Sequence, residues 1–261
     1  GSEGTLAVIT GMILKLLPLP DKIGTMMAVF GSMKDAARAV SGIISSGLIP
    51  RTVEYLDNGA IRCAENYAHA GFPVDAGAVL ILEVDGTEED VQRDLERLKQ
   101  CCLKFKAEDI KLAEDKKDAE NIWKVRKAVS PSLYHFGPDK LNEDIVVPIS
   151  RIPDMVGFIE HEAEISGLKI VTFGHAGDGN IHVNVMYDKN KKNQLSRAED
   201  VTEKIFRETL KLGGTITGEH GVGISKKKYI GMELGKTEIN LMRRIKEVFD
   251  PNNILNPGKI F

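Results

Sequence analysis

The hydrophobic pattern in the first half of the chain predicts alternating strands and helices. The apolar run from Thr25 to Phe30 is typical of a short strand. Apolar positions at helical spacing follow it, with Ser32 placed to cap a helix and Gly47 placed to end it. The alternation of polar and apolar residues from Arg51 to Leu56 then predicts a half-buried strand.

A second strand–helix–strand pattern follows. A strand is predicted from Val79 to Val84, Thr87 and Asp90 resemble a helix cap, and Asp109 to Ala113 predicts another strand. Neither strand–helix–strand pattern contains a glycine-rich phosphate loop, so a Rossmann sheet is the weaker alternative. The pattern predicts an α+β fold, a ferredoxin-like antiparallel sheet with helices on one face.

The second half of the chain predicts more helices around one further pair of strands. The expected helices cover 118–133, 153–166, 192–212 and 237–249, and the expected strands cover 169–173 and 181–187. A glycine-rich turn joins these two strands, and the last helix belongs to a C-terminal helical segment.

The first residues predict the end of a domain rather than its beginning. The sequence has no initiator Met, and Ile9 to Leu17 is an apolar, strand-like run that Pro18 and Pro20 end. Because a strand needs neighbours, we expect residues 1–20 to be the end of a preceding domain and 21–261 to form the next one.

Composition and charge argue against several classes of protein. The net charge of −3 and the pI near 6.1 argue against nucleic-acid binding. The one dense basic run, 226–228, favours a solvated loop over a patch that steers anions. No apolar run reaches the roughly 18 residues of a membrane span. Cys63 and the adjacent Cys101 and Cys102 form no disulfide framework, which favours the cytoplasm.

Two histidines flank the glycine-rich turn. In Gly174-His-Ala-Gly-Asp-Gly-Asn-Ile-His182, a hairpin-like reversal would bring His175 and His182 to one side. Glu219, in Gly218-Glu-His-Gly-Val-Gly223, offers a third ligand. Two histidines and a carboxylate commonly bind zinc, iron or manganese and leave positions open for substrate. A lone histidine beside a turn is usually an ordinary polar residue, but this clustering favours a metal or catalytic site.

Three more side chains are candidates for the same site. Asp178 could ligate, although an aspartate between two glycines is more often a turn former. His220 is the natural general base because histidine titrates near neutrality; alternatively it only orients a ligand. Arg126 falls inside the apolar arc of its helix, where a guanidinium either extends outward or meets a buried anion such as a substrate carboxylate.

Together these segments resemble the C-terminal part of FAD-linked oxidases of the vanillyl-alcohol oxidase type, in the group of glycolate oxidase, D-lactate dehydrogenase and D-2-hydroxyglutarate dehydrogenase. The two histidine motifs match the group's metal and active-site motifs, and Asp250-Pro-Asn-Asn-Ile-Leu-Asn-Pro-Gly-Lys259 matches its closing motif. Gly1-Ser-Glu-Gly-Thr-Leu-Ala-Val-Ile-Thr10 resembles the last flavin-contacting stretch of its FAD domain, with Ala7 in place of an expected glycine.

The resemblance implies a role for each matching residue. The implied metal ligands are His175, His182 and Glu219. His220 is the implied base. The implied substrate-binding residues are Arg126, which would bind the carboxylate, Ser130 and Lys140, the last aligned only with a one-residue gap. The implied cofactor-binding residues are Gly4, Thr5, Ile9, Asn184, Asn256 and Lys259.

The resemblance also implies a reaction, the oxidation of a D-2-hydroxy acid. The carboxylate of the acid would bind Arg126 and its hydroxyl the metal, with zinc the first choice and iron or manganese the alternatives. His220 would take the hydroxyl proton while hydride passes from C2 to FAD. FAD would be held mostly by a half that precedes this chain, so we expect the chain alone to be inactive and to hold FAD weakly.

Two other functions stay open. A metal-dependent hydrolase also suits two histidines, a glutamate and an open position, and a non-catalytic binding domain could use the metal for stability alone. Neither explains the terminal motifs that resemble flavin-contacting segments. Partner subunits, an electron acceptor or a homodimer are all compatible with the sequence, which does not specify the hydroxy acid.

Overall fold

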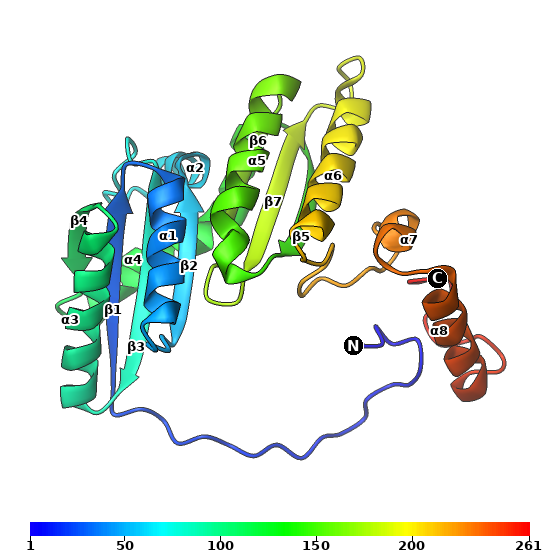
Figure 1. Ribbon diagram of the computed structural model, residues 1–261, viewed down its shortest axis with the longest axis horizontal. Coiled ribbons are helices and arrows are strands. Elements are labelled where there is room, and N and C mark those ends of the chain that lie inside the picture. The colour runs from blue at the N-terminus through cyan, green and yellow to red at the C-terminus, as the bar shows by residue number, and fades with distance from the viewer.

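The computed structural model describes all residues, 1–261. Its centre is a seven-stranded sheet in the order β4-β1-β3-β2-β6-β7-β5, in which every neighbouring pair is antiparallel (Figure 1). The strands are β1 (Lys22–Phe30), β2 (Thr52–Asp57), β3 (Ala78–Gly86), β4 (Ala107–Leu112), β5 (Asp139–Val146), β6 (Lys169–His175) and β7 (Asn180–Tyr187). The predicted antiparallel α+β fold is confirmed.

Eight helices accompany the sheet. They are α1 (Met33–Ser45), α2 (Asn58–Ala68), α3 (Glu88–Lys104), α4 (Lys116–Ser132), α5 (Ile152–Ser166), α6 (Gln194–Lys211), α7 (Ile230–Glu233) and α8 (Lys236–Phe249). The predicted caps form: Ser32 Oγ accepts the Asp35 N–H at 3.2 Å, and Thr87 Oγ1 accepts the Asp90 N–H at 3.2 Å. None of the helices combines the length and apolar character that crossing a membrane requires.

The sheet consists of two units joined side by side, one of four strands and one of three. In the first unit, β3 lies between β1 and β2, and β4 completes the ferredoxin-like order. In the second, β7 lies between β5 and β6. The two units meet where β2 pairs with β6, so that Glu54 lies opposite His175. This junction places residues far apart in the sequence on neighbouring strands.

Helices cover both faces of the sheet. α1, α3, α5 and α6 pack on one face over the larger hydrophobic core. The prediction of helices on one face holds for these four helices and not for α2 and α4. α2 and α4 pack on the opposite face and form a second core with β1, β2, β3 and β6 (Figure 1). This second face also carries buried polar residues, among them Glu54, His182 and Asn184, and the candidate site lies there.

The prediction of a strand from Ile9 to Leu17 is wrong. No strand pairs with this segment, and it runs without helix or strand structure, its side chains exposed, along the lower edge of Figure 1. The residues before it lie instead beside α8 and the C-terminal segment. Lys246 Nζ of α8 donates to the Thr5 carbonyl at 2.9 Å, and Asn256 Nδ2 donates to the Glu3 carbonyl at 2.5 Å.

Candidate functional site

The turn between β6 and β7 brings the two predicted histidines together. Nε2 of His175 lies 3.4 Å from Nε2 of His182. Gly179 makes the turn possible, because it has φ +86° and a Cβ there would lie 2.1 Å from the Val147 carbonyl oxygen. Asp178 Oδ1 accepts the Asn180 N–H at 3.1 Å, which supports its interpretation as a turn former.

Glu219 completes the predicted group of metal ligands. Its Oε1 lies 3.6 Å from Nε2 of His175 and 3.4 Å from Nε2 of His182, and the three ligand atoms all lie within 4.8 Å of one another. Nitrogen and carboxylate donors at these separations suit a divalent transition metal. The Glu219 side chain is 53% exposed and that of His182 is 8% exposed, so the group opens to solvent on the glutamate side.

The two imidazoles have opposite pKa shifts. The hydrogen bond to Glu54 raises the pKa of His175. Burial, reinforced by the neighbouring His175, lowers the pKa of His182 to about 4. His182 is therefore neutral at physiological pH, as a metal ligand must be.

Glu54 is a site residue that the sequence did not reveal. Its Oε1 lies 2.5 Å from Nδ1 of His175, and its Oε2 accepts from Nε of Arg126 at 2.8 Å. The Arg126 guanidinium lies 4.9 Å from the centre of the Phe173 ring. Arg126 therefore faces inward, next to the histidines. Its Nε is its only atom with a protein hydrogen-bond partner, so both Nη groups stay free for an anion.

His220 lies against the metal-ligand group. Its ring stacks on that of His182, with centroids 5.4 Å apart and planes at 19°. Its Nδ1 lies 3.4 Å from Oδ1 of Asp144, and its Nε2 lies 3.9 Å from Oε1 of Glu219. Nε2 therefore faces the ligand group, where a general base would need it.

Asp144, on β5, holds the loop that carries Glu219 and His220, and was also missed. Its Oδ2 accepts the backbone N–H of Gly218, Glu219 and His220 at 2.9, 2.6 and 2.9 Å. Lys226 Nζ donates to Oδ1 at 2.5 Å. Burial would raise the pKa of Asp144, but Lys226 and these amides together lower it. The prediction of a solvated loop is wrong for Lys226, which is buried as this counterion.

The other predicted substrate residues lie together. Ser130 is one helical turn after Arg126 on α4, and Lys140 Nζ approaches its hydroxyl at 3.4 Å. Burial lowers the pKa of Lys140. Asn184, two residues after His182 on the same side of β7, is fully buried, and its Oδ1 has no hydrogen-bond partner. The atom itself is buried, and a buried acceptor without a protein partner is uncommon.

The residues predicted to contact flavin are brought together only in part. Gly4, at φ +72°, lies against Asn256, while Thr5 is held by Lys246. Ile9 is exposed and Lys259 is half-buried, and neither contacts any of these residues through a hydrogen bond. The carboxylate of Glu3 accepts the N–H groups of Val222 and Gly223, both at 2.8 Å, and so links this segment to the loop of His220.

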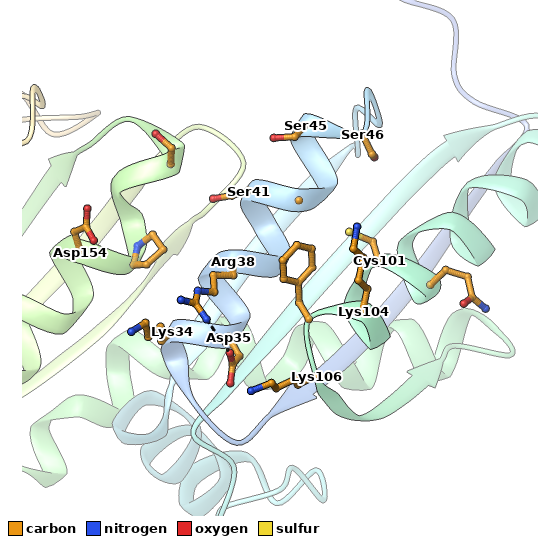
Figure 2. Close-up of a pocket in the computed structure, with 15 residues that line it drawn as sticks. Lys34, Asp35, Arg38, Ser41, Ser45, Ser46, Cys101, Lys104, Lys106 and Asp154 are labelled. Atoms are coloured by element: carbon orange, nitrogen blue, oxygen red, sulfur yellow. Dashed lines mark ion pairs between the residues drawn. The ribbon is translucent and has the colours of Figure 1, made fainter.

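A large cavity lies away from this site. It has a volume of about 1160 Å³ between α1, the end of α3 and the start of α5, and Figure 2 shows Arg38, Lys104, Lys106 and Asp154 around it. It contains none of the predicted site residues. A cavity of about 540 Å³ is lined in part by Glu54, His175 and Asp178, at the edge of the histidine site.

The family comparison defines a flavoenzyme domain: the chain belongs to the family described as FAD linked oxidases, C-terminal domain, which it matches over residues 19–260. It is 42% identical over its full length to the glycolate oxidase subunit GlcD of Bacillus subtilis (strain 168), covering 56% of that protein. It is 39% identical over 99% of its length to GlcD of Escherichia coli (strain K12), covering 52%. The cytochrome-type mitochondrial D-lactate dehydrogenase of Arabidopsis thaliana is 35% identical over the whole chain, which covers 46% of it.

Solved structures support the fold. p-Cresol methylhydroxylase with bound substrate matches with a TM-score of 0.73 at 16% identity, over 94% of this chain and 53% of that one. Alkyldihydroxyacetonephosphate synthase matches with a TM-score of 0.62 at 18% identity, over 99% of this chain and 48% of that one. The chain thus spans about half the length of the proteins it matches.

Proposed function

We propose that this chain is the substrate- and metal-binding part of an FAD-dependent dehydrogenase of small D-2-hydroxy acids, of the glycolate or D-lactate type. The observation that carries the proposal is the grouping of three ligand atoms within 4.8 Å beside Arg126, whose Nη groups are free. The names of the relatives, glycolate oxidase subunit and D-lactate dehydrogenase, support this substrate class.

Each candidate residue of this chain has its own role in the proposed reaction. Arg126 binds the substrate carboxylate through its free Nη groups, because a planar guanidinium matches a carboxylate in a paired geometry. The Nε2 of His220 accepts the proton of the substrate hydroxyl. Ser130 and Lys140 lie further along the same face and contact the remainder of the substrate. Asn184 offers its unpaired Oδ1 to the flavin or to the metal environment.

Two groups complete the proposed site. His175, His182 and Glu219 fit a divalent ion, with zinc the first choice and iron or manganese the alternatives, and such an ion supplies Lewis acidity. FAD supplies the two-electron acceptor, and Gly4, Thr5, Ile9, Asn256 and Lys259 are the proposed contacts from this chain. We further propose that residues 1–20 belong to the FAD-binding part, and that activity requires the half of the protein that this chain does not span.

Partners and compartment are part of the same proposal. The word subunit in the name of the GlcD relatives supports a partner chain, and a reoxidation step requires an electron acceptor. Free Cys63, Cys101 and Cys102 support the cytoplasm. Family membership favours the oxidase over the hydrolase and over a purely structural metal domain.

The test is the reductive half-reaction of the full-length flavoprotein that contains this chain. Mixing it anaerobically with D-lactate or glycolate should bleach the flavin absorbance, and His220→Asn should slow the bleaching at least about 100-fold while the flavin stays bound. Unchanged bleaching in His220→Asn would remove His220 as the base. No bleaching by any small 2-hydroxy acid would overturn the proposed substrate class.

A further inference from the structure

A single carboxylate joins the metal group to the arginine beside it. Oε1 of Glu54 lies 2.5 Å from Nδ1 of His175, and Oε2 lies 2.8 Å from Nε of Arg126. The Glu54 side chain is only 7% exposed, and its carboxylate oxygens meet no other charged side chain within salt-bridge distance. We propose that Glu54 is a positioning residue that sets both the metal-binding face of His175 and the anion-binding face of Arg126. This inference rests on the function proposed above.

Glu54 determines which nitrogen of His175 is available. A carboxylate at Nδ1 fixes the N–H on that atom and leaves the lone pair on Nε2. Nε2 is the atom that faces His182 and Glu219, at 3.4 and 3.6 Å. Without Glu54, the ring could rotate or adopt the other tautomer, and the group would lose one correctly oriented ligand.

The same carboxylate determines how Arg126 is presented. The arginine side chain is 14% exposed, so a buried guanidinium without a counterion would be costly. Binding through Nε fixes the plane of the guanidinium beside Phe173 and leaves both Nη groups without a protein hydrogen-bond partner. The sheet register makes this dual contact possible, because Glu54 and His175 are direct partners across β2 and β6.

A second buried glutamate provides a matched control. Glu83, on β3, accepts from Trp123 Nε1 at 2.6 Å and from Thr25 Oγ1 at 2.8 Å. Trp123 precedes Arg126 by three residues, so Glu83 attaches the same helix, α4, to the same face of the sheet. Glu83 nevertheless has no hydrogen bond or ion pair with His175 or Arg126. A substitution at Glu83 therefore measures the effect of loosening α4 from the sheet, while the contacts that position His175 and Arg126 stay intact.

The experiment compares Glu54→Gln with Glu83→Gln in this chain. A glutamine has an acceptor oxygen at only one of the two positions and a donor NH2 group at the other, so it cannot reproduce the contacts of Oε1 with His175 and of Oε2 with Arg126. We expect Glu54→Gln to weaken Co²⁺ binding, followed by the visible absorbance of the ion, by about 10- to 100-fold. We also expect the Arg126 Nε–H, followed by proton–nitrogen NMR, to exchange with solvent much faster. Glu83→Gln should leave Co²⁺ affinity within about twofold of wild type and keep the Arg126 exchange rate.

The outcomes separate this inference from the proposed function. Failure of the wild-type chain to bind Co²⁺ would contradict the metal site itself. Wild-type binding with an unchanged Glu54→Gln variant would overturn the role of Glu54 alone, and so would equal losses in Glu54→Gln and Glu83→Gln. If Glu54→Gln does not fold, Glu54→Asp, which keeps the charge but shortens the reach, provides the same comparison.

Discussion

The carboxylate of Asp144 lies 3.4 Å from Nδ1 of His220 and accepts the backbone N–H of that same residue at 2.9 Å. One buried side chain thus fixes both the main chain and the ring of the proposed base. Its counterion is Lys226, which also donates to the carbonyls of Asp144 and Ile216 at 2.9 and 2.8 Å. The loop of Glu219 and His220 is therefore preorganised by a fully satisfied ion pair.

Replacement of Asp144 by Asn should be strongly destabilising. It removes the closer of two carboxylates beside the buried Lys226, since Glu143 Oε2 lies 3.6 Å from Nζ, and breaking a buried ion pair costs about 3–5 kcal/mol. Urea unfolding measures the loss. The exposed pair of Lys228 and Glu199, at 2.8 Å, provides the control, because Lys228→Met should cost no more than about 1 kcal/mol. Equal small losses in both variants would show that the Asp144 pair does not hold the loop.

Arg126→Ala should act on substrate binding. Loss of charge-assisted hydrogen bonds worth about 1.5–3 kcal/mol should raise KM for the hydroxy acid about 10- to 100-fold in the full-length enzyme. Lys228→Ala, at an exposed site, should leave KM unchanged. Steady-state kinetics with both variants decides the matter, and an equal small effect of the two would remove Arg126 from the substrate site.

His182 should titrate far below an ordinary histidine in the metal-free protein. Its pKa is lowered from 6.5 to about 4, so between these values the unfolded chain binds a proton that the folded chain does not. Its contribution to stability is complete above pH 6.5 and decreases as the pH falls toward 4. NMR titration of the imidazole measures the pKa. The free energy of unfolding of wild type relative to His182→Ala should fall over the same range, whereas titration near 6.5 would contradict the buried environment.

Gly179→Ala should damage the histidine turn. The new Cβ would lie 2.1 Å from the Val147 carbonyl oxygen, in addition to the strain of φ +86°. Gly213 has a similar φ of +81° but no atom within 4 Å, so Gly213→Ala isolates the cost of the backbone conformation, about 1 kcal/mol or more. We expect Gly179→Ala to lose more stability and, unlike Gly213→Ala, to lose Co²⁺ affinity. Similar behaviour of the two variants would contradict the close approach.

Much of the fold could be predicted because its signals are local. The four long helices of the second half, α4, α5, α6 and α8, lie within two residues of their predicted bounds, since capping residues and helical periodicity mark them, whereas the four-residue α7 was not predicted. β5 and α2 were missed for physical reasons. β5 buries Asp144 in a run that reads as polar, and α2 begins directly after β2, where Asp57 ends the strand and caps the helix at once.

The candidate site could be predicted only as far as its motifs extend. His175, His182 and Glu219 lie in glycine-rich segments that the sequence marks, and the structure brings them together. Glu54 and Asp144 act from strands whose neighbours depend on sheet order, which no local pattern specifies. The run from Ile9 to Leu17 was misread because apolar character alone does not provide a neighbouring strand.

The measurement that tests the account most directly is the metal content of the purified chain beside a His175→Ala, His182→Ala double variant. After loading with zinc, iron or manganese and removal of free metal, elemental analysis should find about one ion per wild-type chain and none in the double variant. Metal retained by the double variant, or absent from the wild type after loading, would contradict the His-His-Glu site.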